Sequence, residues 1–309
     1  MDKMKNPVEL EYHIADVFTT EALKGNSLAV VFDTCGLTTA RMQAVAREFN
    51  LSETTFVKRG DPAAERSEGV RVRIFTTQEE LDFAGHPTLG TACVLMRTAP
   101  ECAENDTVKL KLNVGTVPVK FSPTLAGGGA LYGEMTQRDP VFGAELDREG
   151  VARLCGLAAG DLDPELAPQV VSTGTAFAIV ALRSVDVLGR LKVDHDAATP
   201  WLREFGGRWF YCLAPTPGQN ENAAKQYRAR MQFYGGEDPA TGSAAGCAIS
   251  YLVRHGAVAS DAPAVVIQGV EIGRPSEIHL AARRLDARVT DVRVGGSTVP
   301  VANGRLFLP

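Results

Sequence analysis

Two copies of one short pattern hold the residues best suited to chemistry. The copies occupy residues 86–92 and 238–244, and both read titratable residue, Pro, two variable residues, Gly, Thr or Ser, Ala. A run of small and apolar residues follows each copy and predicts a buried helix. A repeat separated by about half of the chain predicts two similar halves, with His86 and Asp238 opening the two copies at one shared cleft.

The Gly-Thr and Gly-Ser steps of the two copies predict a binding site for an anion. The start of a buried helix offers backbone N–H groups and the positive end of the helix dipole, and glycine lets a ligand approach the backbone. Two such helix starts would bind a carboxylate or a developing enolate oxygen. The alternative is a pair of ordinary capped helices, but a titratable residue at the same place in both copies favours a binding site.

The titratable residues of the pattern suit proton transfer. A neutral histidine and a carboxylate can exchange protons with carbon or oxygen, and Pro87 and Pro239 would fix the chain beside each of them. Glu53 is a third candidate, because it stands in a segment of otherwise apolar and β-branched residues. Burial removes the hydration of a carboxyl and favours its protonated form, so that Glu53 would carry a proton near neutral pH. The alternative for Glu53 is a solvent-facing strand residue.

A weaker polar candidate is Asn26, which follows Gly25 in what reads as a tight turn. Its alternative is a plain turn residue, since asparagine favours turns for reasons of its own backbone hydrogen bonding.

Composition and charge describe an ordinary soluble globular chain. Its 309 residues give room for two domains, and 45% apolar with 22% charged residues is typical of such proteins. The net charge of −5, without a Lys/Arg stripe among aromatic residues, argues against a nucleic-acid partner. No apolar run reaches the roughly 18–20 residues that cross a bilayer, and no apolar signal segment follows the N-terminal lysines. We therefore expect a cytoplasmic protein that binds neither nucleic acid nor membrane.

The six cysteines and five histidines form no metal-binding or redox pattern. The chain contains no CxxC pair, no HExxH, no Cys/His ligand spacing and no glycine-rich nucleotide loop. The sequence therefore calls for no metal and no organic cofactor. Cys93 and Cys247 follow the two copies of the pattern inside the expected helices, where we expect them in the core.

Strand patterns dominate, and each half has one or two helices, which predicts the α+β class. In each half we expect antiparallel or mixed sheet around a buried central helix, such as the small, apolar segment 244–253. Gly127 and its glycine neighbours, in segment 122–133, predict a linker. Four further expectations are a surface loop, a hairpin, one long strand and a closing hairpin, at residues 59–69, 107–121, 169–182 and 299–308, respectively.

The chain resembles the PhzF family of isomerase-like proteins of phenazine biosynthesis. Segments 51–57 and 268–276 look most like the member that isomerises trans-2,3-dihydro-3-hydroxyanthranilate. The matching stretches keep their order over nearly the whole chain, and they are residues 25–26, 50–57, 73–76, 83–92, 237–246 and 268–276.

This resemblance implies a diaminopimelate epimerase-like fold of two pseudo-symmetric lobes, each a curled sheet around a central helix, with the site between them. We expect an N-terminal lobe of residues 1–126, completed by the last C-terminal residues, and a C-terminal lobe of residues 130–309. The resemblance also implies a homodimer without metal or organic cofactor that acts on a small carboxylic acid.

The resemblance further implies roles for single residues. Glu53 would be the acid/base that moves a proton from C3 to C1 of the cyclohexadiene, while His86 and Asp238 bind the amino and hydroxyl groups and tune protonation. The remaining substrate-binding groups would be Asn26, Ser52, Gly85, Thr241, Gly242 and Ser243. Epimerases and racemases of the same fold place cysteine where this chain has His86 and Asp238, so racemisation by two thiolates is not expected.

Three departures from the family pattern leave the substrate open. Ser27 stands where the family usually has Pro, segment 230–237 is shorter than the usual loop, and segment 174–177 replaces a more polar stretch. The last two would line the pocket rather than supply the proton carrier. An isomerase or cyclase of another secondary metabolite is therefore the alternative within enzymes, and a small-acid binding protein without turnover is the alternative outside them.

Overall fold

The chain divides into two compact units in a computed structural model that describes residues 8–32, 34, 36–125, 129–217, 224–233 and 236–308. Unit 1 consists of Met1–Leu23, Ser27–Gly133 and Ser297–Pro309, and unit 2 consists of Lys24–Asn26 and Glu134–Gly296, each within the described residues. Glycines 127 and 128 of the expected linker lie outside the described residues, as do Cys35, residues 1–7 and part of the turn at 215–220.

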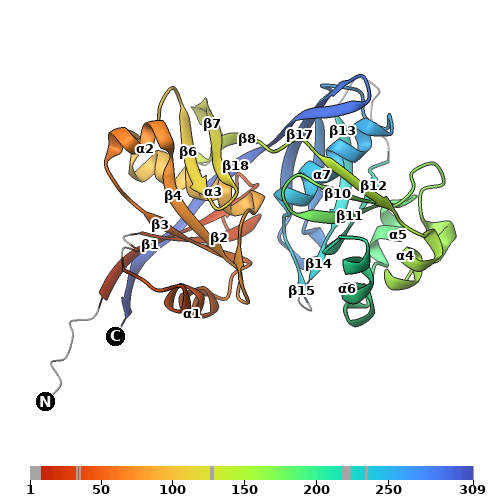
Figure 1. Cartoon of the computed structure of the whole chain (residues 1–309), viewed down its shortest axis with the longest axis horizontal. Helices are drawn as coiled ribbons and strands as arrows, with labels where there is room; N and C mark the ends of the chain where they lie inside the picture. Colours follow the sequence, from red (N-terminus) through yellow and green to blue (C-terminus); the bar gives the residue numbers. More distant parts are fainter. Residues whose placement is uncertain are drawn as a thin grey trace, which may run out of the picture. The chain divides into compact units, whose positions relative to one another are not determined.

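The strands of unit 1 form a closed barrel (Figure 1, red to yellow, with β18 in blue). Their hydrogen-bonded order is β1-β2-β3-β4-β6-β7-β8; β5 pairs with β4, and β18 lies next to both β8 and β1, which closes the path. The strands are β1 (Val8–Val17), β2 (Asn26–Val31), β3 (Glu53–Lys58), β4 (Val70–Phe75), β5 (Glu80–Leu81), β6 (Thr107–Leu112), β7 (Gly115–Leu125), β8 (Leu131–Thr136) and β18 (Arg288–Leu308).

A buried helix, α3 (Gly85–Thr98), forms the centre of unit 1 and packs against β1, β3, β6 and β7. Its residues from Gly85 to Leu95 are all buried, which matches their small and apolar side chains. Gly90 allows the close approach, because a Cβ there would lie 2.6 Å from side-chain atoms of both Leu28 and Val17. The helix can therefore sit directly on the first two strands.

The outer face of unit 1 carries α1 (Thr39–Phe49), α2 (Pro62–Glu68) and the short 3-10 helix η1 (Pro100–Cys102). The Thr38 hydroxyl caps α1 by accepting from the Arg41 amide, and Asn50 ends it in the left-handed conformation. Apolar residues of α1 form a cluster with Phe56 and Phe75 of β3 and β4. Strand β3 therefore packs against α1 as well as against α3.

The strands of unit 2 follow the hydrogen-bonded order β18-β17-β16-β13-β12-β11-β10-β9. Most neighbours are antiparallel, whereas β11–β12 and β13–β16 are parallel. The strands are β9 (Val141–Glu145), β10 (Gln169–Ser172), β11 (Ala176–Ala181), β12 (Trp209–Pro215), β13 (Lys225–Arg230), β16 (Ala264–Gln268) and β17 (Ser276–Leu285), with β14 (Gln232–Phe233) and β15 (Gly236–Glu237) as a separate pair.

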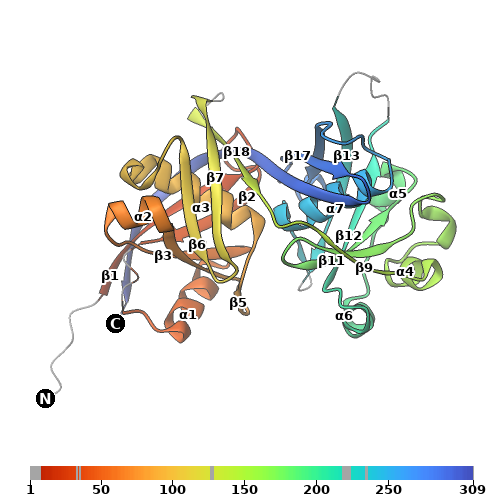
Figure 2. The ribbon, with the colours of Figure 1, turned by 45° about the horizontal axis from the view of Figure 1, so that its top comes forward.

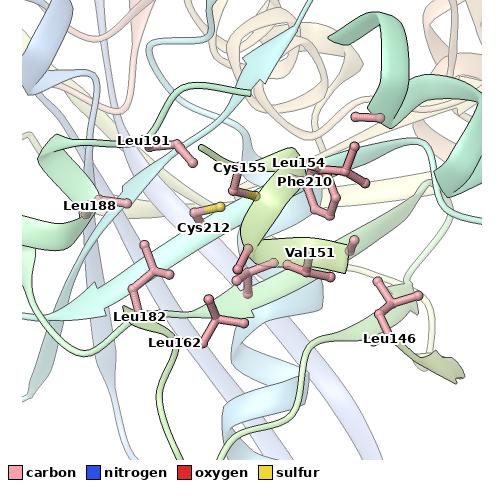
Figure 3. Packing of buried hydrophobic residues seen from close by; sticks show 14 of the residues in the cluster. Leu146, Val151, Leu154, Cys155, Leu162, Leu182, Leu188, Leu191, Phe210 and Cys212 are labelled. Carbon is pink, nitrogen blue, oxygen red and sulfur yellow. The ribbon is translucent and has the colours of Figure 1, made fainter. Parts of the chain in front are cut away.

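A second buried helix, α7 (Gly242–Arg254), is the centre of unit 2 and packs against β10, β11 and β17 (Figure 2). All of its residues from Gly242 to Val253 are buried. The other face of β10, β11 and β12 holds an apolar cluster with the outer helices (Figure 3). Those helices are α4 (Arg148–Leu154), α5 (Val185–Gly189) and α6 (His195–Glu204), and two 3-10 turns are η3 (Ala159–Asp161) and η4 (Val270–Ile272).

These elements confirm the α+β class, the two central helices and the hairpin of residues 107–121. The surface-loop prediction for residues 59–69 was wrong, because Asp61 caps α2 and Pro62 occupies the helix start that suits proline. The long-strand prediction for residues 169–182 was also wrong. It consists of β10 and β11, which form an antiparallel hairpin around Gly174.

The closing hairpin predicted at residues 299–308 is the third error, because these residues continue the single strand β18 and pair with β1. Asn-Gly pairs such as Asn303-Gly304 favour the turn of a hairpin. Gly304 is needed for another reason: it pairs with Tyr12, and a Cβ there would lie 2.7 Å from the Tyr12 hydroxyl.

Candidate active site

Unit 1 brings together two of the three titratable candidates. Glu53 is the first residue of β3 and His86 is the second residue of α3, and both side chains are buried. His86 Nδ1 lies 3.0 Å from Glu53 Oε2. The approach lacks hydrogen-bond geometry, so Oε2 has no hydrogen-bond partner among the described residues. The solvent-facing alternative for Glu53 is thus wrong, and a buried carboxyl and a buried imidazole lie next to each other.

The local sequence explains why His86 lies at this helix start. Pro87 is tolerated there because the first-turn residues have no helical acceptor for their N–H groups. Thr88 stabilises the turn, since its hydroxyl donates to the Ala84 carbonyl over 2.6 Å. Ala84 supplies no side-chain cap, so the N–H groups of the first turn, in which His86 lies, receive no hydrogen bond from it.

The two copies of the sequence pattern are not placed alike on their helices. In the first copy the helix starts at Gly85, so that Gly90 and Thr91 lie in its middle, and the prediction that they form a helix start was wrong. In the second copy Gly242 and Ser243 do begin the helix. The difference follows from proline, because Pro87 fits inside the first turn whereas Pro239 lies three residues before α7.

Asp238 belongs to unit 2, where its carboxylate is buried and held on both sides. Asn26 Nδ2 donates to Oδ1 over 2.8 Å, and the Thr241 hydroxyl donates to Oδ2 over 2.7 Å. Asn26 also donates to the Ala240 carbonyl over 2.9 Å. Both oxygens of this carboxyl therefore have a donor among the described residues. The plain-turn alternative for Asn26 is wrong, because its side chain is one of the two groups that fix Asp238.

Gln268 is a site residue to which sequence reasoning gave no role. Its side chain is fully buried; Nε2 donates to the Asp238 carbonyl and to the Thr241 hydroxyl over 2.8 and 3.0 Å. Its Oε1 accepts from the Thr241 amide and from the Tyr211 hydroxyl, both over 3.1 Å. A glutamine at the end of a buried strand was the available signal, since a buried amide requires several partners.

The residues just before Asn26 are hydrogen-bonded to the turn around η4, and these contacts hold Asn26 beside Asp238. The Gly25 amide donates to the Pro275 carbonyl over 3.1 Å, and Arg274 donates to the carbonyls of Gly25 and Lys24 over 2.8 Å each. Segments 25–26 and 268–276, which are far apart in sequence, therefore form one hydrogen-bonded structure that supports Asp238.

The first turn of α7 contains the Gly-Ser step at the start of a buried helix that was expected of an anion-binding site. Its N-cap residue Thr241 gives its hydroxyl to Asp238 and makes no side-chain cap. Gly242 and Ser243 follow, both buried, and the Gly242 carbonyl accepts from Gln137 over 3.0 Å. In unit 1, Ser52 is half-buried and immediately precedes Glu53.

Two departures from the family pattern have local structural explanations. Ser27 donates its hydroxyl to the buried Asp16 over 2.6 Å, a contact that proline would not make. In the shortened segment, Arg230 and Glu237 form a buried two-pronged ion pair at 2.9 and 2.7 Å, which raises the pKa of Arg230. Residues 234 and 235 of this segment lie outside the described residues.

Neither central-helix cysteine is set up as a thiolate. Cys93 and Cys247 are buried, as expected. Burial raises the pKa of both thiols, that of Cys247 to about 11. Cys155 and Cys212 lie in the outer cluster of unit 2 (Figure 3), and the contact with Cys212 together with burial raises the pKa of Cys155.

No cluster of three or more His, Cys, Asp or Glu side chains suited to a metal ion is present among the described residues. Within the same part of the chain, no helix combines the length and the apolar character needed to cross a membrane.

The architecture of the chain is that of the epimerase-like isomerases. A hydroxyproline epimerase from Agrobacterium vitis superposes with a TM-score of 0.64 at 9% identity, over 98% of this chain and 92% of that one. The solved structure of a predicted epimerase from Pseudomonas aeruginosa gives a TM-score of 0.79 at 34% identity, over 96% and 98% of the two chains. These matches confirm the fold class.

The sequence comparisons define the family within this class. The family model described as phenazine biosynthesis-like protein, PhzC-PhzF, matches residues 15–304, and the chain belongs to this family. The trans-2,3-dihydro-3-hydroxyanthranilate isomerase of Pseudomonas aeruginosa is 37% identical over 96% of this chain and 99% of its own length. The protein is therefore a PhzF-like isomerase, as its resemblance predicted.

Proposed function

We propose that the protein isomerises a small cyclic unsaturated amino or hydroxy acid, for which trans-2,3-dihydro-3-hydroxyanthranilate is the first candidate. Glu53 is the acid/base that moves the proton. The observation that carries this proposal is the buried Glu53 carboxyl 3.0 Å from the buried His86 imidazole, at the start of a buried helix. The named activity of the 37% identical relative supports the choice of substrate.

The proposed reaction moves one proton from carbon to carbon through Glu53 and a second one in the enol–ketone step, so that the composition of the molecule is unchanged. The Glu53 carboxylate takes the proton from C3, the electron pair of the broken C3–H bond enters the ring, and the two conjugated double bonds each move by one position. The protonated Glu53 then delivers the proton to C1, where a new C–H bond forms. The enol left at C3 becomes a ketone when its hydroxyl proton moves to carbon.

His86 and Asp238 have supporting roles in this proposal. His86 lies beside Glu53 and can balance its charge as the carboxyl gains and loses a proton. Asp238 binds a polar group of the substrate and does not carry the proton, because Asn26 and Thr241 hold both of its oxygens in place. Its assignment to the substrate rests on the sequence pattern and on the contacts within unit 2.

The carboxylate of the substrate is assigned to the backbone N–H groups of Gly242 and Ser243 at the start of α7, and Gly85 at the start of α3 is a further candidate from the sequence pattern. Asn26 and Thr241 complete the polar surroundings of Asp238, and Ser52 adds a hydroxyl next to Glu53. Metal and organic cofactors have no part in the proposed reaction.

Replacement of Glu53 tests the proposal. Glu53→Gln keeps the shape of the side chain but cannot accept the proton, so kcat should fall by about 100-fold to 10,000-fold. Glu65→Gln is the matched control, because Glu65 is another buried carboxylate of unit 1, paired with Arg59 at 2.9 Å. Product formation should be followed by absorbance and mass spectrometry, and the control should keep kcat within about threefold.

Full activity of Glu53→Gln would contradict the assignment of the proton carrier. A wild-type protein that binds 3-hydroxyanthranilate, keeps this binding after loss of Glu53 and turns over no cyclic diene acid would instead be a binding protein. Turnover of another diene acid, with the same dependence on Glu53, would keep the mechanism and replace the substrate.

A further inference from the structure

The strand that carries Glu53 and the helix that carries His86 are joined by a second polar contact. The hydroxyl groups of Thr55 and Thr91 lie 2.8 Å apart, and both residues are completely buried. Thr55 is the third residue of β3, two after Glu53, and Thr91 lies in α3, five after His86. Side chains two residues apart on a strand point to the same face, so Glu53 and Thr55 both face α3.

We propose that the Thr55–Thr91 hydroxyl pair is a positioning contact that sets the distance between Glu53 and His86. Two residues along a strand span about 6.8 Å, and five residues along a helix span about 7.5 Å. The two contacts therefore attach β3 to α3 at two points with a similar step along both axes, although the five-residue step also turns the helix by about 140°. This inference rests on the proposed role of Glu53.

The hydroxyl pair holds the strand and the helix closer than apolar side chains would. Two oxygens joined by a hydrogen bond lie 2.8 Å apart here, whereas two methyl groups in contact lie about 3.5–4.0 Å apart. Valine at both positions would therefore add about 1 Å at this point. A displacement of about 1 Å can reduce the rate about 100-fold when it affects reacting groups.

Thr54 provides a matched control on the same strand. It is completely buried, but its side chain points to the opposite face from Thr55, the face that holds Phe56 and the α1 cluster. Its hydroxyl has no hydrogen-bond partner among the described residues. Thr54→Val removes a buried hydroxyl of the same kind without touching the link to α3.

The test measures kcat, KM and melting temperature for Thr55→Val, Thr55→Ser, Thr54→Val and the double variant Thr55→Val/Thr91→Val. Thr55→Val should lower kcat at least about tenfold with KM changed less than about threefold, because the contact affects the proton-transferring pair. Thr55→Ser keeps the hydroxyl and should retain kcat within about threefold. Thr54→Val should also remain within that range.

The double variant separates positioning from stability. Thr55→Val alone removes a partner of the buried Thr91 hydroxyl and should lower the melting temperature, whereas replacing both partners should restore it. We expect kcat of the double variant to stay low although its melting temperature recovers. Recovery of kcat together with melting temperature would overturn the proposal, and so would a loss in Thr54→Val as large as that in Thr55→Val.

Glu53→Gln distinguishes failure of this proposal from failure of the proposed function. If Glu53→Gln is inactive and Thr55→Val is fully active, the pair is not a positioning contact, and the role of Glu53 stands. If Glu53→Gln is fully active, the proton carrier is another group, and the positioning proposal is overturned with it.

Discussion

At the scale of residues, the two buried candidate carboxyl groups, one in each unit, differ in their surroundings. Glu53 has one imidazole beside it and an oxygen without a hydrogen-bond partner among the described residues. Asp238 has an amide donor on one oxygen and a hydroxyl donor on the other. Two carboxylates in unlike surroundings can take unlike roles, one mobile in proton exchange and one fixed as a charge.

The cysteines of the central helices are not suited to act as acid/base groups. Racemisation by thiolates would require an ionised thiol, yet burial raises the pKa of Cys247 to about 11 from a usual value of 9.0. At pH 8 roughly one such thiol in a thousand is ionised. Thiols with raised pKa also make the fold less stable as the pH rises between about 9 and 11, because the unfolded chain ionises first.

Alkylation therefore gives a direct check at this scale. Native protein treated with iodoacetamide at pH 8 should keep Cys93 and Cys247 unmodified and should keep its activity, whereas denatured protein should react at all six cysteines. Peptide mass spectrometry reads out each site. Rapid labelling of Cys247 in active protein, with loss of turnover, would show that the thiol is accessible and ionised and would contradict its structural role.

At the scale of elements, both central helices were predictable, but their first turns were not. The apolar periodicity of α3 and α7 predicts burial on every side, and the structure confirms it. The exact start depends on one proline: Pro87 fits within the first turn of α3, while Pro239 stays outside α7. A pattern shared by both segments could not distinguish these cases, because proline is tolerated in either place.

The turn around η4 shows how an element supports the site through its backbone. Gly269 follows Gln268 with φ of +75°, and a Cβ there would lie 2.4 Å from the Arg274 carbonyl oxygen and 2.6 Å from that of Pro239. Gly273 has a similar φ of +71°, but no atom lies within 4 Å of its ideal Cβ. A side chain at either glycine would therefore strain the left-handed backbone, but only at Gly269 would it also collide with neighbouring atoms.

Alanine substitutions at these glycines should separate the two costs. Gly273→Ala should lower the free energy of unfolding by about 1–2 kcal/mol, the cost of a left-handed alanine. Gly269→Ala should lower it by about 3 kcal/mol or more, since backbone atoms next to Gln268 and Asp238 must also move. Urea denaturation measures both values, and equal losses would contradict the close packing around Gly269.

At the scale of the whole molecule, the fold class and family follow from the sequence, whereas several long-range features do not. The continuity of β18 depends on pairing with β1, nearly three hundred residues away for Val8 and Leu308. Asn303-Gly304 locally favours a turn, and only the Tyr12 ring next to Gly304 shows why a strand keeps this glycine. Local patterns do not contain such contacts.

The buried polar positions of the candidate site were predictable to a similar degree, and their roles remain proposals. Glu53, His86 and Asp238 stood out because titratable residues in apolar or repeated surroundings are unusual. Gln268 and Arg274 did not, because their importance comes from contacts with Thr241 and Gly25, which lie far away in sequence. The homodimer and the cytoplasmic location remain predictions.

The transfer of an isotope from one carbon to the other tests the central claim most directly. Substrate carrying deuterium at C3 should be turned over by the whole enzyme in ordinary water, and deuterium at C1 of the product should be measured by mass spectrometry and NMR. Because the Glu53 side chain is only 10% exposed, the account predicts that a measurable share of the deuterium reaches C1 before it exchanges with solvent. Two results together would contradict the account. The first is wild-type product without deuterium at C1, and the second is an unchanged rate of product formation by Glu53→Gln.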